Sequence, residues 1–303
     1  MTMKRRLALI GMALGALANP ALAKVPTIVT DNPVVQSLVW EVTAGIAAPE
    51  VLLGTGEDIH DFQLRPSQAT ALDNADIVIW AGHELAPWLD SALSARPGVS
   101  SLELLDVDGT AKRPPSNAAL PGAGAHSSSE DPHAWLDPEN AVLWLGAIAE
   151  ALTRADPANA AEYHANATLA QARISALGAD ISARLSPYAG NPLVVSHDAY
   201  AHFAGRFGLT VLGTIRLGDA ANPGARHISN LRTAIAEHPG ICVFPEFAEP
   251  DDYLVVLTEG LSVTIGEPLD PEGRGLALGQ DLYRQLLDGM ARSIAKCLGD
   301  QHP

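Results

Sequence analysis

Short apolar runs bounded by turn residues alternate with amphipathic stretches along most of the chain. In the first half, apolar runs fall at residues 26–30, 50–53, 76–81 and 101–105, and helical patterns at 33–46, 67–74 and 84–94. In the second half, apolar runs fall at 193–196, 210–214, 241–245 and 262–265, and helical patterns at 199–207, 228–237, 251–260 and 276–298. Short apolar runs between helices are typical of buried parallel strands. The pattern predicts two α/β lobes, each with a parallel sheet of about four strands.

A long helical pattern separates the two series. Residues 157–185 contain no internal proline, and their apolar positions recur mostly at steps of three and four. Such a stretch predicts one helix of roughly 42 Å, which is long for a globular protein. We interpret it as a rigid connector. The predicted domains are an N-terminal lobe at 24–155, a connector helix at 156–188 and a C-terminal lobe at 189–303.

The first 23 residues resemble a secretory signal peptide, and we expect them not to be part of the fold. A positive segment (Lys4, Arg5 and Arg6) precedes a short apolar run, and Ala21 and Ala23 form an A-x-A cleavage site. We therefore expect export to an oxidising compartment, most simply a bacterial periplasm. There the only two cysteines, Cys242 and Cys297, can form a disulfide; the alternative is two buried free thiols.

Composition and charge exclude several classes of function. The 303 residues carry 35 acidic against 19 basic side chains, a net charge of −16, and the chain has 10 histidines. This charge and the lack of a Lys/Arg cluster argue against a nucleic-acid partner and against an anionic membrane surface. The hydrophobic fraction of 47% argues against disorder. The histidines are thus the feature that calls for an explanation.

Three histidines and one aspartate share a position in the pattern, just beyond the end of a predicted strand. They are His60, His133, His197 and Asp270. Ligands of open α/β sheets bind outside the carboxyl ends of the strands, so these side chains can meet in a cleft between the lobes. Three imidazoles and a carboxylate suit a borderline ion such as Zn²⁺. Asp61, Asp137 and Asp198 are candidates to orient an imidazole through its second nitrogen.

Five segments carry a resemblance to a known family. They are residues 60–67 (HDFQLRPS), 74–82 (NADIVIWAG), 131–138 (DPHAWLDP), 196–200 (SHDAY) and 269–273 (LDPEG). Together they resemble the metal-binding periplasmic solute-binding proteins of ABC importers, over about residues 25–299. The resemblance implies two α/β lobes bridged by a single long helix. It also implies a metal site in the cleft, with His60, His133, His197 and Asp270 as ligands.

The third ligand position bears on which metal is bound. In this family manganese proteins usually have Glu there and zinc proteins usually have His, so His197 implies zinc. Glu246 is expected to support the site through a hydrogen bond, and Glu246 or a water molecule is the alternative to Asp270 as fourth ligand. Many zinc proteins of the family carry a His-rich loop before the second ligand. The corresponding loop here, residues 109–130, has only His126, so its role in metal capture is left open.

The expected function is high-affinity Zn²⁺ binding in the periplasm and delivery to an ABC permease in the inner membrane. A monomer is expected, and a periplasmic metallochaperone is a possible further partner. The alternatives are a manganese-binding importer component, a periplasmic zinc hydrolase and a binder of an organic solute. A hydrolase needs an open metal position for water, whereas four protein ligands fill a tetrahedral shell and favour transport over an enzyme.

Overall fold

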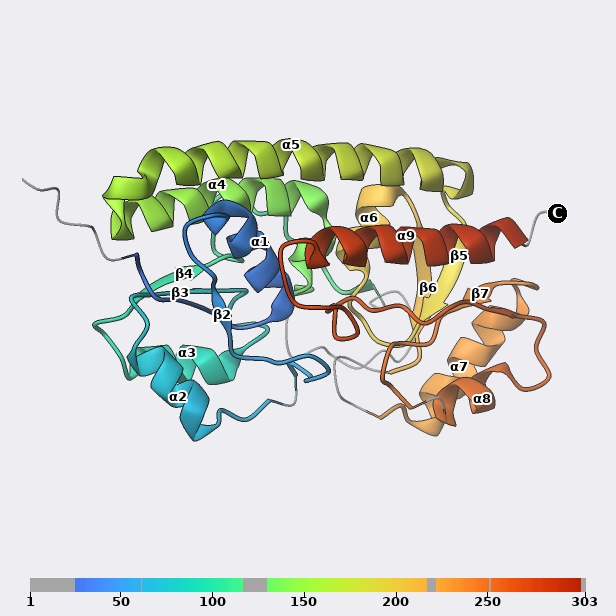
Figure 1. Ribbon diagram of the computed structural model, residues 1–303. Coiled ribbons are helices and arrows are strands. Elements are labelled where there is room, and N and C mark those ends of the chain that lie inside the picture. The colour runs from blue at the N-terminus through green and yellow to red at the C-terminus, as the bar shows by residue number, and fades with distance from the viewer. Residues whose placement is uncertain (1–24, 61, 117–129, 217–221, 251, 301–303) are drawn as a thin grey trace, which may run out of the picture.

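The computed structural model describes residues 25–60, 62–116, 130–216, 222–250 and 252–300. The predicted signal peptide at 1–23, Asp61 and His126 lie outside the described residues. Two parallel sheets lie at the two ends of an elongated molecule, and long helices run along one side of both (Figure 1). The two predicted α/β lobes are thus present.

The first sheet contains β1 (Ile28–Thr30), β2 (Glu50–Val51), β3 (Ile77–Trp80) and β4 (Ser100–Glu103), in the order β2-β1-β3-β4. Its central strands β1 and β3 are wholly buried, as their continuous apolar sequence predicts. Helices α1 (Pro33–Thr43) and α4 (Pro138–Ala155) lie on one side of this sheet, and α2 (Pro66–Asp73) and α3 (Pro87–Ser94) on the other (Figure 1). This architecture places the carboxyl ends of the strands toward the second lobe.

The second sheet repeats the topology of the first. It contains β5 (Pro192–Val195), β6 (Thr210–Thr214), β7 (Cys242–Val243) and β8 (Thr264–Ile265), in the order β6-β5-β7-β8. Helices α6 (Ala201–Phe207) and α9 (Leu282–Asp300) lie on one side, and α7 (Ala225–Ala236) and α8 (Asp252–Thr258) on the other (Figure 1). The apolar runs therefore located all eight of these strands, although several are shorter than predicted.

Local sequence explains where helices α1 and α4 begin. Asn32 caps α1, since its side-chain oxygen accepts hydrogen bonds from the backbone amides of Val34 and Val35. Pro33 occupies the first turn, where its missing amide proton is not needed. Asp137 caps α4 in the same way, again ahead of a proline. Both caps fix the direction in which the chain leaves the site and enters a helix.

The long helix predicted at 157–185 is α5 (Ala160–Leu185), preceded by a single 3₁₀ turn, Pro157–Asn159. It packs against α1 and α4 of the first lobe and against α6 and α9 of the second (Figure 1). Helix α9 also reaches across and contacts α1. One apolar core runs through these helices into both sheets, and a smaller one lies between the second sheet and helices α7 and α8.

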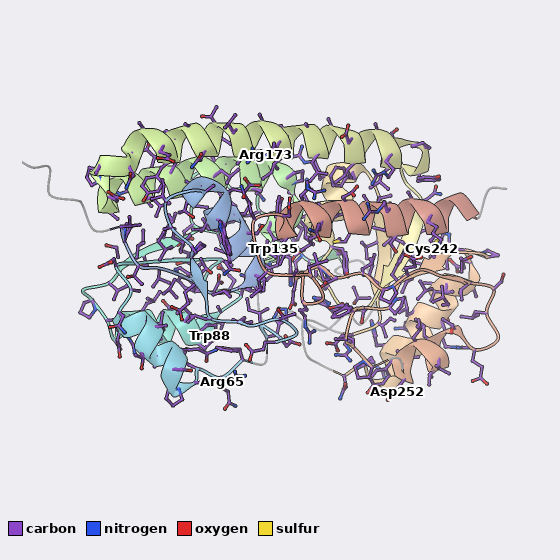
Figure 2. The ribbon with its side chains drawn as sticks, viewed as in Figure 1. Arg65, Trp88, Trp135, Arg173, Cys242 and Asp252 are labelled. Atoms are coloured by element: carbon purple, nitrogen blue, oxygen red, sulfur yellow. A yellow bond between two sulfur atoms is a disulfide. The ribbon has the colours of Figure 1, made fainter. Side chains whose placement is uncertain are left out.

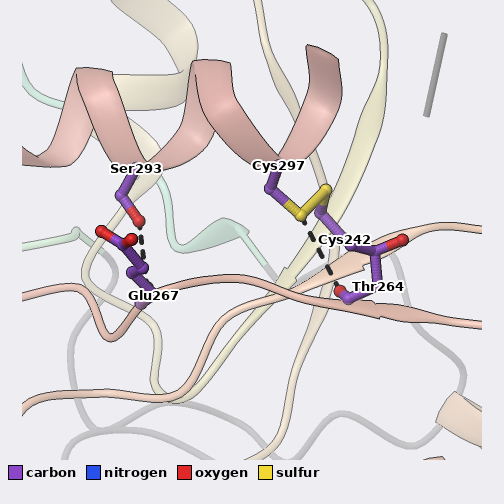
Figure 3. The surroundings of a disulfide bond; sticks show 5 residues. All are labelled: Cys242, Thr264, Glu267, Ser293 and Cys297. Carbon is purple, nitrogen blue, oxygen red and sulfur yellow. Dashed lines mark hydrogen bonds between the residues drawn. A yellow bond between two sulfur atoms is a disulfide. The ribbon is translucent and has the colours of Figure 1, made fainter. Parts of the chain in front are cut away.

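The two cysteines are joined. The Cys242–Cys297 disulfide has an S–S distance of 2.06 Å and ties β7 to α9 (Figure 3). Cys242 is also marked beneath α9 in Figure 2. Pairing of these cysteines was expected from the oxidising compartment, and the disulfide is confirmed. None of the helices in the described ranges has the length and apolar content needed to cross a lipid bilayer.

Candidate metal site

Three of the four predicted ligands come together between the lobes. The imidazole centroids of His60, His133 and His197 lie 5.3–5.9 Å apart. The fourth member of the group is Glu272: one potential ligand atom from each of these four residues lies within 4.8 Å of all the others. His60 and Glu272 already contact each other, with His60 Nε2 3.2 Å from Glu272 Oε1. The group is therefore a compact set of three nitrogens and one oxygen.

Both lobes contribute to this group. His60 lies in the loop after β2, and His133 immediately precedes the 3₁₀ turn η2 (Ala134–Leu136) that leads into α4. His197 follows the end of β5, and Glu272 lies in the loop between β8 and α9. An ion held by all four side chains would therefore link the two lobes.

Asp270 is not in this group. Its Oδ1 accepts a hydrogen bond from the backbone amide of Arg274, and its Oδ2 accepts one from Gly275. Aspartate commonly closes a turn in this way, because its short side chain reaches amides a few residues ahead. Glutamate is less suited to that role, and Glu272, two residues later, is the carboxylate that faces the histidines. Asp270 thus stabilises the turn of this loop, and Glu272 faces the site.

Two buried carboxylates orient two of the histidines. Asp131 Oδ1 accepts hydrogen bonds from the backbone amide of His133 and lies 2.8 Å from its Nδ1. Glu246 Oε2 lies 2.5 Å from His197 Nδ1. A carboxylate on Nδ1 fixes the ring and directs Nε2 toward a metal. Glu246 is thus the hydrogen-bond partner of a candidate ligand, which is the role expected of it.

Two of the three carboxylates expected to orient an imidazole, Asp137 and Asp198, contact other groups in the structure. Asp137 caps α4 and also accepts hydrogen bonds from Arg206 at 2.7 and 3.0 Å. Asp198 accepts a hydrogen bond from the backbone amide of Ser116. The prediction for Asp137 was therefore wrong. Its contact with the guanidinium of Arg206, 69 residues away, could not be predicted from the sequence.

Asp131 also connects the site to the second lobe. Its Oδ2 accepts a hydrogen bond from the backbone amide of Ala201 at the start of α6. The carbonyl oxygen of Asp131 lies 3.1 Å from Nε2 of the buried His202. One buried aspartate thus holds a histidine of the first lobe and the first turn of a helix of the second. His202 is thereby accounted for as a structural residue.

The electrostatics distinguish the carboxylates near the site. Burial raises the pKa of Glu272, but the hydrogen bond to His60 and the nearby His197 and His133 outweigh it and bring the pKa below its usual value. Burial raises the pKa of Asp270, and its backbone hydrogen bonds only partly offset this effect. Glu272 is therefore the acid of this loop that is readily ionised, as a metal ligand must be.

A second group of potential ligands, His83, Glu84 and Glu103, lies on the surface of the first lobe. His83 Nδ1 lies 2.8 Å from Glu103 Oε1, and the His83 side chain is more than half exposed. The hydrogen bond to Glu103 outweighs the slight burial and raises the pKa of His83, as in an ion pair. This group is therefore an exposed ion pair, unlike the buried site between the lobes.

Comparison with known proteins gives matches along most of the chain. The chain is 40% identical to the high-affinity zinc uptake system protein ZnuA of Paracoccus denitrificans (strain Pd 1222), covering 96% of this chain and 97% of that protein. It is 30% identical to the protein of that name from Brucella abortus (strain 2308), covering 86% of this chain and 88% of that one.

Among solved structures, a ZnuA crystal structure matches with a TM-score of 0.75 at 22% identity, covering 90% of this chain and 98% of that one. The binding protein FpvC from Pseudomonas aeruginosa, in complex with Mn²⁺, matches with a TM-score of 0.77 at 20% identity, covering 92% of this chain and all of that one. These two matches show the fold. The family model of the zinc-uptake complex component A, periplasmic (ZnuA), matches residues 28–297, and the chain belongs to this family.

Proposed function

We propose that this protein binds Zn²⁺ in the periplasm and delivers it to the membrane permease of an ABC importer. The observation that carries the proposal is the convergence of three imidazoles and Glu272 from both lobes. Imidazole nitrogens suit Zn²⁺, whereas a site for Mn²⁺ is richer in oxygen ligands. The zinc-uptake names of the relatives support the same cargo.

The proposed ligands are His60, His133, His197 and Glu272. In this assignment Asp270 shapes the loop and Glu246 orients His197, which departs from the set expected from the sequence. Four protein ligands fill the tetrahedral shell that Zn²⁺ prefers, and they leave no position for a reactive water. This is the reason to propose a transport protein and not a zinc hydrolase. The proposed molecule is a monomer with lobes at 24–155 and 189–303 joined through residues 156–188.

The arrangement of the ligands couples metal binding to the positions of the loops that carry them. Metal binding links the loop after β2 and the segment before α4 with two loops of the second lobe. The free energy of coordination therefore stabilises the closed arrangement of these loops over any arrangement that separates them. A permease that holds the loops apart would lower the affinity for the ion, and this is how release at the membrane is proposed to occur.

The test is metal content and affinity of the purified exported protein. Elemental analysis should give one zinc per chain, and a competition titration against a chelator should show that His197→Ala lowers the affinity by orders of magnitude. Glu272→Gln should weaken binding much more than the matched change Asp270→Asn, because only the first removes a ligand charge. A larger effect of Asp270→Asn would restore Asp270 as the fourth ligand. Near-wild-type affinity of His197→Ala would refute the site.

A further inference from the structure

The candidate metal site is closed off from solvent by a second group of side chains. A cavity of about 10 Å³ adjoins the site and has room for about one water molecule. Its walls combine three members of the candidate site with other residues: Asp58, His60, Ser196, His197, Arg216, Glu246, Glu249 and Glu272. A hydrated zinc ion is much larger than one water molecule. Side chains must therefore move before an ion can enter or leave.

A chain of ion pairs centred on Glu249 begins in the wall of this cavity and extends to Arg274 beside it. Glu249 Oε2 lies 2.7 Å from Arg216 Nη1, and Glu249 Oε1 lies 2.9 Å from Arg274 Nη1. The same Arg274 nitrogen lies 3.5 Å from Asp58 Oδ2. Asp58 belongs to the first lobe and the other three residues belong to the second, so the chain of ion pairs crosses the seam. We call these four residues the mouth.

The exposure of the side chains gives their order from the inside out. The side chains of His133, His197 and His60 are 0%, 5% and 8% exposed. Those of Arg274, Glu249 and Arg216 are 11–16% exposed, and Asp58 is 32% exposed. The mouth residues are therefore more exposed than the candidate histidines, and Asp58, Arg216 and Glu249 share a cavity with the site.

The backbone beside Glu249 adopts an unusual conformation. Ala248 has φ = 63° and is the only non-glycine residue with positive φ in the described ranges. This conformation is uncommon for residues with a Cβ and costs about 1 kcal/mol or more. It lies between Glu246, which contacts His197, and Glu249, and both acids line the cavity. The loop thus accepts local strain where it brings both carboxylates to one cavity.

We propose that Glu249 holds Arg216 at the cavity and Arg274 beside it as an ionic gate, and that opening this gate limits the rate at which the metal enters and leaves. The proposal rests on the proposed metal site. Two guanidinium groups beside the candidate site repel a cation that approaches or leaves it, and Glu249 contacts both of them. Breaking its ion pairs frees the arginines to swing toward solvent. Metal exchange then requires only side-chain and loop motion.

Kinetics separate a gate from a simple charge effect. Removing the negative charge of Glu249 should, by Coulomb's law alone, slow the arrival of Zn²⁺, and removing the positive charge of Arg274 should slow its release. A gate predicts the reverse for both. We expect Glu249→Gln to speed both arrival and release at least fivefold, and Arg274→Gln to speed release at least threefold.

The measurement uses the full mature protein loaded with Zn²⁺. Release is followed by stopped-flow mixing with a large excess of chelator, and arrival by competition with a fluorescent zinc indicator. The chain offers a matched control in Asp288, another acid between two arginines, which contacts Arg184 and Arg292 on the α5–α9 side of the molecule. Asp288→Asn should leave both rates unchanged.

The outcomes are distinct. If Glu249→Gln binds one zinc at wild-type rates, or if Arg274→Gln slows release, the gate is wrong and the metal site stands. Equal acceleration in Asp288→Asn would also overturn the gate, because the effect would then reflect general loosening. If the wild-type protein holds no zinc at all, the proposed function fails first, and elemental analysis reports this before any kinetic run.

Discussion

The seam between the lobes is built in two different ways on its two sides. On one side, helices α1, α5 and α9 pack together in a continuous apolar core, which we call the spine (Figure 1). On the other side lies the mouth, held by ion pairs of Asp58, Arg216, Glu249 and Arg274. Burial of apolar side chains is lost only with the fold, whereas ion pairs can separate without unfolding and weaken as salt screens them.

Buried hydrogen bonds extend the spine toward the site. Ser37 Oγ donates to the carbonyl oxygen of Gln280 and accepts from the amide of Tyr283, whose hydroxyl donates to the carbonyl oxygen of Trp135. The indole of Trp135, marked near the middle of Figure 2, donates to the carbonyl oxygen of Pro271. The lobes are therefore fixed to one another where they contact these helices. We therefore expect loop motion at the mouth and little change in the angle between the lobes.

The largest expected effect concerns the covalent tie of the spine to the second sheet. Replacing both Cys242 and Cys297 by alanine should lower the free energy of unfolding of the metal-free protein by about 4 kcal/mol, because the disulfide closes a loop spanning 55 positions. Denaturant titration measures this loss. Zinc release from the variant should keep its wild-type rate at temperatures where it stays folded. A faster release would show that the spine and the mouth are mechanically coupled.

A smaller effect is expected from a substitution that creates a cavity inside the spine. Ile181 on α5 is fully buried, and Ile181→Ala should lower the free energy of unfolding by about 3 kcal/mol while zinc exchange stays within a factor of about two. Leu169→Ala on the same helix is the control, since Leu169 is 59% exposed and its loss should cost under about 0.5 kcal/mol. Comparable losses in the two variants would show that the buried face of α5 does not stabilise the spine.

Much of the fold could be predicted from the sequence because its signals are local. Apolar runs located the strands, and Asn32 with Pro33 located the start of α1. The strands β2, β7 and β8 proved shorter than their apolar runs, since each pairs over only two residues and the remaining apolar residues pack in loops. Helix α9 was expected from residue 276 but begins at Leu282.

The site could be predicted only in part, because its remaining signals are long-range. Position after a strand end identified His60, His133 and His197, which the structure brings together. Glu272 was missed, because telling it from Asp270 depends on the shape of a turn, for which the turn-forming preference of aspartate was the available signal. The partners of Asp131, Glu246 and Arg274 come from segments distant in the chain, and no periodicity encodes them.

The smallest expected effect compares the paired acids of the mouth with a buried acid that has no cation partner among the described residues. Asp31, at the end of β1, accepts hydrogen bonds from the backbone amides of Asn32 and Ala81, and burial raises its pKa from 3.8 to about 6 despite these bonds.

The folded protein therefore holds the proton of Asp31 more tightly than the unfolded chain does. Its contribution to stability is complete below about pH 4 and is lost as the pH rises through about 6, a loss of roughly 2–3 kcal/mol. Asp31→Asn carries no charge at any pH. The free energy of unfolding of this variant, relative to the wild type, should therefore rise by that amount between pH 4 and 7 in metal-free protein.

The change with pH is the informative quantity, because any constant cost of the new amide group cancels. Asp73→Asn is the control: Asp73 is an exposed partner of Arg96, and its replacement should show no such rise. A flat difference between Asp31→Asn and the wild type would mean that the amides of Asn32 and Ala81 compensate fully for burial. Asp31 would then resemble the acids of the mouth, whose charge is held by its partners, and the contrast between interior and mouth would rest on packing alone.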